Sequence, residues 1–150
     1  GTGGAMRSVY KAGVFNGPAL VTMGDDLYRQ EDLERLLTFD VAVLACELED
    51  SSRFGLLDTD REGRLQGIIE RPHAPGYGLV NTGAYMIDQA YFSCDPVRIS
   101  ETEYGLPQTL ALSAQNRPIS VLRTRVWQPV GQPEDITLGE AFLERYRLEI

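Results

Sequence analysis

Residues 41–46 form an apolar run, VAVLAC, in which polar side chains do not alternate with apolar ones. A run of this kind is typical of a β-strand that is covered on both faces. It closely follows residues 31–37, whose leucines have helical spacing, and these follow another compact apolar run at residues 19–23. The order strand, helix, strand predicts a β-α-β unit, so we expect a largely parallel sheet in this region.

The rest of the chain continues to alternate between helix and strand signals. Residues 58–63 are polar and end in Gly63, so the apolar segments 54–57 and 65–69 are predicted to pair as a hairpin. Further strands are expected at residues 79–87 and 119–126, and further helices at residues 5–12, 106–114 and 133–146. This alternation predicts a single domain of the α/β class.

Composition excludes several classes of function. With 43% hydrophobic residues, the 150-residue chain can bury the core of one domain. The net charge is −8 and the 14 Lys and Arg residues are scattered, which argues against nucleic-acid binding. No apolar run is long enough to span a bilayer and no leader pattern is present, so we expect no membrane partner and a cytoplasmic location. Cys46 and Cys94 lack metal or redox spacing and are expected to be free thiols.

Five segments, each a weak signal alone, stand in an informative order. They are GTGGAMRSVYK, ALVTMGDDLYRQEDLERLL, SRFGLLDTDREGRLQGIIERP, LVNTGAYMI and VWQPVGQPEDITLGEAFLERY. In this order and at these separations they resemble the successive landmarks of the sugar-nucleotidyltransferase family. The resemblance implies a three-layer α/β/α, Rossmann-like fold with a mixed, mainly parallel sheet. It also implies transfer of a nucleotidyl group from a nucleoside triphosphate to a sugar 1-phosphate, with release of pyrophosphate.

Such a reaction brings two polyanions together, and a hard cation such as Mg²⁺ reduces their repulsion and takes carboxylate oxygens as ligands. Asp25 matches the metal ligand of the family, and the resemblance therefore implies that Asp25 is the catalytic, metal-binding residue. Its place in the turn Gly24-Asp25-Asp26, directly after an apolar run, agrees with that role. Alternatively, Asp25 and Asp26 form a solvated turn ahead of the next helix.

Four residues match sugar-phosphate-binding positions of the family. The resemblance implies that the backbone of Gly55 and the side chains of Glu70 and Asn81 contact sugar hydroxyls. The triplet that is Glu-Lys-Pro-like in the family is Glu70-Arg71-Pro72 here, so Arg71 would supply the cation that faces the phosphate. Arg keeps the charge of Lys but changes its geometry. Glu70 can also be interpreted as an exposed strand-end charge, and Asn81 as a turn residue.

Gly1, Thr2 and Gly4 match the segment that lies against the nucleotide base in the family. The family's opening Gly-rich loop and its following Lys, which hold the triphosphate, have no counterpart in these 150 residues. We therefore expect residues 1–150 to be the C-terminal two-thirds of one nucleotidyltransferase-like domain, N-terminally incomplete and inactive alone. The missing part would belong to a longer protein or to another polypeptide. The starting glycines are also compatible with a flexible or engineered end.

A second departure concerns the metal. Many relatives place an Asp before the turn near the end of the chain, whereas Pro129 occupies that position here. Either Asp26, Gln128 or a water molecule replaces this ligand, or the intact protein binds metal poorly. Trp127 is expected to be a core residue, and His73 a loop residue without a catalytic role.

Three functions remain open from the sequence. The first is a magnesium-dependent nucleotidyltransferase, and the second is a catalytically silent subunit that binds a sugar phosphate, which Pro129 supports. The third is a glycosyltransferase with an Asp-x-Asp metal motif, for which residues 58–60 have the spacing although a hairpin turn is expected there. An uncovered sheet edge would favour a homo-oligomer. The sequence does not identify the sugar or the base.

Overall fold

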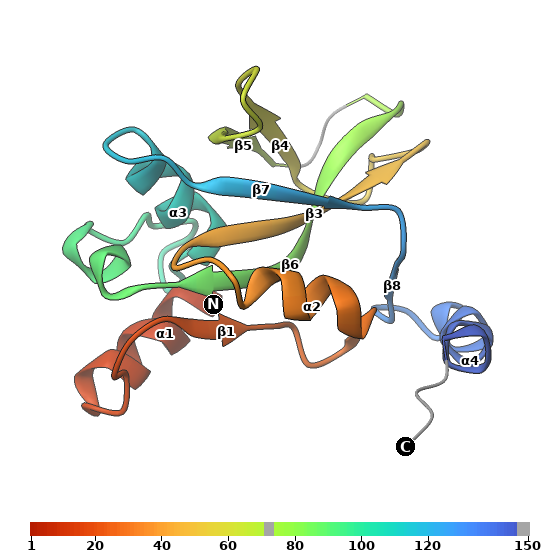
Figure 1. Ribbon diagram of the computed structural model, residues 1–150, viewed down its shortest axis with the longest axis horizontal. Coiled ribbons are helices and arrows are strands. Elements are labelled where there is room, and N and C mark those ends of the chain that lie inside the picture. Colours follow the sequence, from red (N-terminus) through yellow and green to blue (C-terminus); the bar gives the residue numbers. More distant parts are fainter. Residues whose placement is uncertain (71–73, 147–150) are drawn as a thin grey trace.

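The computed structural model describes residues 1–70 and 74–146, and strand β3 lies inside its main sheet (Figure 1). β3, Ala42–Leu48, contains the apolar run, and its first five residues are all buried. On one side β3 pairs in the antiparallel direction with β6, Gly78–Ile87, and on the other it pairs in parallel with β7, Ser120–Thr124. The prediction of a strand covered on both faces is confirmed.

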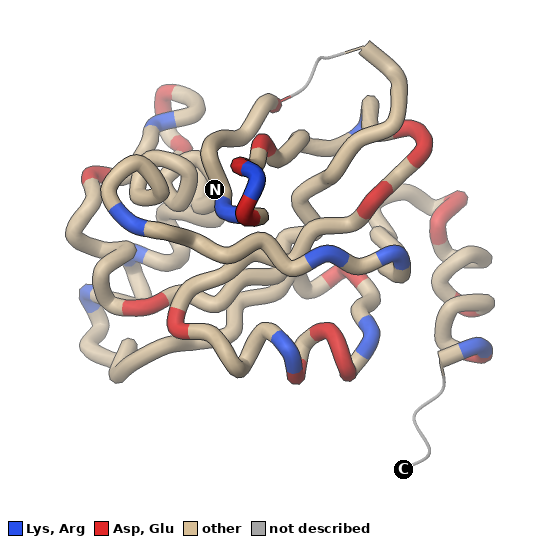
Figure 2. The backbone as a smooth tube through the Cα atoms, turned by 45° about the horizontal axis from the view of Figure 1, so that its top comes forward, with Lys and Arg blue, Asp and Glu red and all other residues tan. Residues whose placement is uncertain are grey.

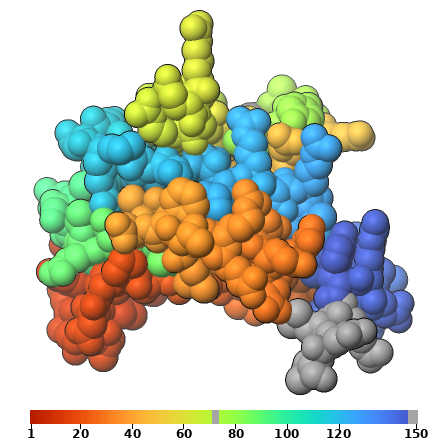
Figure 3. All heavy atoms as spheres, viewed as in Figure 1, coloured from red at the N-terminus to blue at the C-terminus, as the bar shows by residue number. Residues whose placement is uncertain are grey.

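The main sheet of the described residues has six strands in the order β5-β4-β6-β3-β7, with β1 paired to β6. The remaining strands of this sheet are β1 Ala19–Val21, β4 Leu56–Thr59 and β5 Leu65–Ile69. β4 and β5 form the predicted antiparallel hairpin, whose connecting turn projects from the body of the molecule (Figure 3). A separate antiparallel pair joins β2, Asp26–Tyr28, to β8, Trp127–Pro129.

The mixed α/β sheet is confirmed, but fewer of its strand pairs are parallel than the sequence predicted. β1 and β3 run in the same direction, as a β-α-β unit requires, yet the antiparallel strand β6 lies between them. Among the described strands, β3 and β7 are the one pair that is hydrogen-bonded in parallel. An apolar run shows that a strand is buried, but it carries no information about the direction of the neighbouring strands.

Helices cover both faces of the sheet and give the expected three layers. The helices are α1 Thr2–Lys11, α2 Gln30–Leu36, α3 Leu106–Ala114, α4 Asp135–Arg145 and the 3-10 helix η1 Gln89–Ser93. On one face, Met6 of α1 and Leu110 of α3 belong to the same buried cluster as Val43. On the other face, Leu36 of α2 belongs to a cluster with Leu44. Because side chains alternate along a strand, adjacent residues of β3 serve opposite layers.

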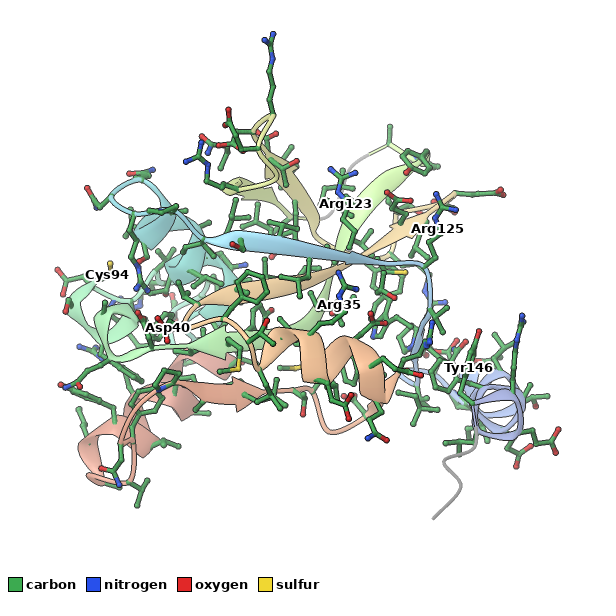
Figure 4. The ribbon with its side chains drawn as sticks, in the orientation of Figure 1. Arg35, Asp40, Cys94, Arg123, Arg125 and Tyr146 are labelled. Atoms are coloured by element: carbon green, nitrogen blue, oxygen red, sulfur yellow. The ribbon has the colours of Figure 1, made fainter. Side chains whose placement is uncertain are left out.

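Charged side chains protect the edge of the sheet at β7. Arg123 and Arg125 each pair with Glu47 at 3.3 Å, and Figure 4 shows both arginines along this edge. Charge on an edge strand disfavours pairing with another chain. Elsewhere the Lys and Arg residues of the described part of the chain are spread over the molecule (Figure 2). Within residues 1–70 and 74–146, no helix is both long and apolar enough to cross a membrane.

Strand β6 contains a bulge where it pairs with β3. Pairing changes from Ala45 opposite Asn81 to Val43 opposite Tyr85, so residues 82–84 of β6 lie opposite a single residue of β3. A bulge bends its strand and changes the direction in which the adjacent side chains point. This bulge consists of the Thr-Gly of the motif Asn-Thr-Gly and the alanine that follows.

Gly83 makes the bulge possible. Its φ of +78° lies in the left-handed region, and a Cβ at this position would lie 2.5 Å from Cγ of Met23. Next to it, Oγ1 of Thr82 donates a hydrogen bond of 2.8 Å to the carbonyl oxygen of Leu44, and so satisfies a buried acceptor on β3.

We predict that Gly83→Ala lowers the free energy of unfolding by about 1–3 kcal/mol, because it adds both backbone strain and a steric clash. Urea denaturation measures the change. Gly67→Ala is the matched control, since its Cβ would point into open space and its φ is not positive. Equal stability of Gly83→Ala and the unmodified protein would contradict this account of the bulge.

Candidate functional site

Segments that are far apart in the sequence surround a cavity of about 760 Å³. They include the start of α1, the turn after β1, the loop between β3 and β4, the bulge of β6, strand β8 and the start of α4. The lining residues include Thr2, Asp25, Asp26, Arg53, Phe54, Asn81, Trp127, Pro129, Gln132 and Asp135. A concave wall with carboxylates, a guanidinium group and aromatic rings is suited to a polar ligand that also has a flat or apolar part.

Trp127 and Asp26 connect the two strands on one wall of this cavity. Trp127 is 9% exposed, and its indole Nε1 donates a hydrogen bond of 3.2 Å to Oδ2 of Asp26. The indole also contacts the ring of Phe54 edge to face, with 4.9 Å between the ring centroids. The expectation that Trp127 is a core residue is confirmed, and one part of it also borders the cavity.

Asp25 and Asp26 are adjacent carboxylates in different environments. Asp25 is exposed at the cavity, whereas Asp26 is half-buried. Burial raises the pKa of Asp26 above its ordinary value; the hydrogen bond from Trp127 opposes this shift, and the charge of Asp25 adds to it. The hydroxyl of Tyr28 donates its hydrogen bond to the carbonyl oxygen of Thr82 at 2.7 Å and lies 3.4 Å from Oδ2 of Asp26.

The described residues offer few ligands for a metal ion. Residues 1–70 and 74–146 contain no group of three or more His, Cys, Asp or Glu side chains that could hold one. Pro129 stands opposite Asp26 in the register of β2 and β8, so this position of β8 supplies no carboxylate. Mg²⁺ is commonly held by one or two carboxylates together with substrate phosphates. Asp25 therefore fits a metal that the substrate helps to bind.

Asn81 lies in the cavity wall and is held by three hydrogen bonds. Its backbone N donates to the carbonyl oxygen of Gly55 at 2.9 Å, and its Nδ2 donates to the hydroxyl of Tyr85 at 2.7 Å. Its Oδ1 accepts from the backbone N of Gly83 at 3.1 Å. The side chain is thereby fixed in direction, while one amide proton and one oxygen lone pair remain for a ligand.

Gly55 and Glu70 lie beside each other but outside the set of lining residues. A Cβ on Gly55 would lie 3.3 Å from Oε2 of Glu70, and Oε1 of Glu70 accepts a hydrogen bond from Nε2 of Gln108. Gly55 is linked to the cavity through its hydrogen bond with Asn81. Arg71 lies outside the described residues. The structure therefore brings Gly55, Glu70 and Asn81 into one neighbourhood.

At the start of α1, Thr2 borders the cavity, whereas Gly1 and Gly4 do not. The sequence reasoning missed Gly3, whose backbone N donates a hydrogen bond of 2.9 Å to the carbonyl oxygen of Tyr104. A Cβ on Gly3 would lie 2.9 Å from the same oxygen, so a glycine is required for this close approach. Three glycines among four residues were the available signal.

Arg53 and Asp135 were also missed. Nη2 of Arg53 lies 3.4 Å from Oδ2 of Asp135, which is buried and also accepts from the backbone N of Gln132 at 3.0 Å. Only an Asp near a Pro at a helix start marked this place in the sequence.

By contrast, Asp60 of the Asp-x-Asp motif accepts from the backbone N of Glu62 and of Arg64 within the hairpin turn. The motif thus serves the turn.

A family model described as "Nucleotidyl transferase" matches residues 1–145, and this family generally uses a divalent metal ion. The chain is 29% identical over 141 residues to the bifunctional sugar-1-phosphate nucleotidylyltransferase/acetyltransferase of Sulfurisphaera tokodaii, covering 91% of this chain and 34% of that protein. It is 29% identical over 153 residues to the mannose-1-phosphate guanylyltransferase of Mycobacterium tuberculosis, covering 97% and 42%. It is 33% identical over 128 residues to the UTP–glucose-1-phosphate uridylyltransferase of Haloferax volcanii, covering 81% and 51%.

Solved structures share the fold. An apo UDP-glucose pyrophosphorylase superposes with a TM-score of 0.76 at 21% identity, covering 99% of this chain and 61% of that one. HddC from Yersinia pseudotuberculosis, solved with GMP-PN, superposes with a TM-score of 0.63 at 24% identity, covering 95% and 62%. The chain thus spans about a third to a half of the length of the curated relatives named above.

Cys46 belongs to the buried cluster that contains Trp127 and Val80. Burial raises the pKa of its thiol from 9.0 to about 11. The fold thus favours the protonated thiol, and the associated stability is present below pH 9 and is lost as the pH rises through about 11.

We predict that a thiol reagent at pH 8 modifies the half-exposed Cys94 rapidly in the folded protein and spares Cys46.

Mass spectrometry of the labelled protein identifies the modified thiol, and denaturant should make both thiols react. Cys94→Ser should leave no rapidly reacting thiol in the folded state. Equal labelling rates of the two cysteines in folded protein would contradict the prediction.

Proposed function

Because the chain belongs to the nucleotidyl transferase family, we propose that the protein transfers a nucleotidyl group from a nucleoside triphosphate to a sugar 1-phosphate and releases pyrophosphate. Curated relatives named for this chemistry, with different sugars and bases, support the reaction class. The observation that carries the proposal is the cavity that gathers Asp25, Asn81 and Thr2 from three distant segments. We propose a sugar 1-phosphate and a nucleoside triphosphate as its ligands.

In this proposal the chain orients the sugar phosphate. Asn81, held in direction by Gly83 and Tyr85, offers its remaining amide proton to a sugar hydroxyl. Glu70, beside Gly55, accepts from another hydroxyl, and Arg71 is the proposed source of positive charge for the phosphate. A sugar phosphate is already ionised at neutral pH, so fixing its attacking oxygen in line is the main task of these residues. No general base is needed.

Asp25 is the proposed ligand of Mg²⁺, which would neutralise phosphate charge in the transition state. Its exposure at the cavity leaves the carboxylate oxygens available. Asp26 faces Pro129 and accepts a hydrogen bond from Trp127, which reduces its availability as a ligand. Gly1, Thr2 and Gly4 are proposed to lie against the nucleotide base, with Thr2 nearest to the cavity.

We further propose that residues 1–150 are the C-terminal two-thirds of one nucleotidyltransferase domain. The two superpositions include 99% and 95% of this chain, but only 61% and 62% of the solved chains. The triphosphate-holding loop would then be contributed by residues outside this chain. Activity is accordingly expected of the full-length gene product.

A second candidate function is a catalytically silent subunit that binds a sugar phosphate. The observation that favours it is Pro129, which stands opposite Asp26 at the position where the family resemblance implies a second metal-binding carboxylate. In that case the full-length protein would bind a hexose 1-phosphate without turnover, and Pro129→Asp would raise its affinity for Mn²⁺.

The proposed function is tested by pyrophosphate release from the full-length gene product with Mg²⁺, using hexose 1-phosphates against the common nucleoside triphosphates. We predict turnover for at least one pair, and a loss of at least about 100-fold in kcat with Asp25→Ala, because the proposed metal ligand is removed. Asp58→Ala in the exposed hairpin is the matched control and should keep full activity. Turnover that survives Asp25→Ala would refute its role, and binding without turnover would favour the silent subunit.

A further inference from the structure

A second cavity, of about 150 Å³, lies among α1, η1 and α3 and shares no lining residue with the cavity described above. Figure 4 labels Cys94, one of its lining residues, at the end of the molecule where η1 lies (Figure 1). The sequence analysis and the proposed function assign no role to this place.

The charged wall of this second cavity is formed by Arg7 and Lys11 of α1. They are four residues apart on the helix, so their like charges lie on the same side and repel. Neither cation forms an ion pair with any residue of 1–70 or 74–146, although the chain has 22 acidic residues. The helix dipole favours Lys11 in the last turn, but it does not account for Arg7.

The apolar wall is aromatic. Tyr10 of α1 stacks on Phe92 with 4.2 Å between ring centroids and 15° between ring planes. Tyr91 meets Phe92 edge to face at 5.1 Å. The stacked faces of Tyr10 and Phe92 cover each other, and the rest of these rings lines the cavity together with Tyr91.

Tyr91 supplies a buried polar group that lacks a partner. It is 2% exposed, and within the described part of the chain its hydroxyl has no hydrogen-bond partner. Thr109 lies on the same cavity, but its hydroxyl already accepts from the backbone N of Val97 and donates to the carbonyl oxygen of Gly105. Burial raises the pKa of the Tyr91 hydroxyl, and its contact with the Thr109 hydroxyl and the charge of Arg7 oppose that rise. An unsatisfied buried hydroxyl is costly, and a ligand would remove that cost.

We propose that this second cavity binds a small anion carried on a flat apolar body of about one ring. Arg7 and Lys11 would pair with the anionic group, Tyr91 would donate its hydroxyl proton to it, and the rings of Tyr10 and Phe92 would pack against the flat body. A cavity of this volume accommodates a ligand of about the size of benzene. The inference is independent of the proposed function, because it uses none of the residues assigned there.

Helix α1 borders both cavities. Thr2 at its first turn lines the large cavity, whereas Arg7, Tyr10 and Lys11 line the small one. An occupant of the small cavity therefore contacts the helix whose beginning forms part of the proposed nucleotide site.

Phenyl phosphate is the probe, and isothermal titration calorimetry without nucleotide measures its binding. We expect one saturable site, with affinity about tenfold weaker for Arg7→Gln, because one charged hydrogen bond is lost. Arg61→Gln, which removes the same charge from the exposed hairpin turn, should bind normally, as should Arg53→Gln in the large cavity. Absence of saturable binding, or equal weakening by Arg61→Gln or Arg53→Gln, would overturn the proposal.

Tyr91→Phe separates a ligand-binding hydroxyl from a structural one. It should weaken phenyl phosphate binding about fivefold while the melting temperature stays equal or rises, since an unpartnered buried hydroxyl is removed. A lower melting temperature with unchanged affinity would overturn the proposal.

Inorganic phosphate and phenol should each bind more weakly than phenyl phosphate, and equal binding of inorganic phosphate would refute the aromatic part. Failure here would leave pyrophosphate release unaffected, so the two proposals are distinguishable.

Discussion

The bulge in β6 is the constraint on which the large cavity depends. Strand β6 is hydrogen-bonded to β1, β3 and β4, so a change in its path affects most of the sheet. Residues 82–84 fit opposite a single residue of β3 because Gly83 adopts a left-handed conformation and Thr82 satisfies the carbonyl of Leu44. Asn81 enters the cavity wall at the start of this bulge, and the backbone N of Gly83 fixes its amide. The motif Asn-Thr-Gly thus has a structural role, because it forms the bulge. Through the bulge it also sets the direction of the Asn81 side chain at the cavity.

Two adjacent carboxylates differ because tertiary contacts treat them differently. Asp25 stays in the solvated turn and faces the cavity, whereas Asp26 begins β2 and is drawn against Trp127 of β8. Burial disfavours charge on Asp26, and the indole of Trp127 donates a hydrogen bond to its Oδ2. The pairing of β2 with β8 therefore decides which of the two carboxylates is available to a ligand, and it does so through segments about one hundred residues apart.

Close backbone approach shapes both cavities. Gly3 allows the first turn of α1 to reach the carbonyl of Tyr104, and this contact sets the helix against the start of α3. The same helix then presents Arg7, Tyr10 and Lys11 to the small cavity. The pattern of apolar residues predicts neither arrangement. Glycine has no side chain that could contribute to such a pattern, and Arg7 and Lys11 alone would indicate a solvated helix face. The contact with Tyr104 involves residues that are distant in the chain.

Local patterns predicted most of the elements but not β2, β8 or η1. The helix at residues 106–114 is found with its predicted bounds, and the hairpin around the Asp-Thr-Asp turn and the buried strand at residues 42–46 are confirmed. The order of motifs indicated the family, and it pointed to Asp25, Thr2 and Asn81, which the fold gathers at one cavity. The sequence could not place antiparallel β6 between β1 and β3, pair Arg53 with Asp135, or set Pro129 opposite Asp26. Periodicity reports which faces of an element are buried, whereas strand order, register and the meeting of distant side chains depend on long-range packing, which only the tertiary structure decides.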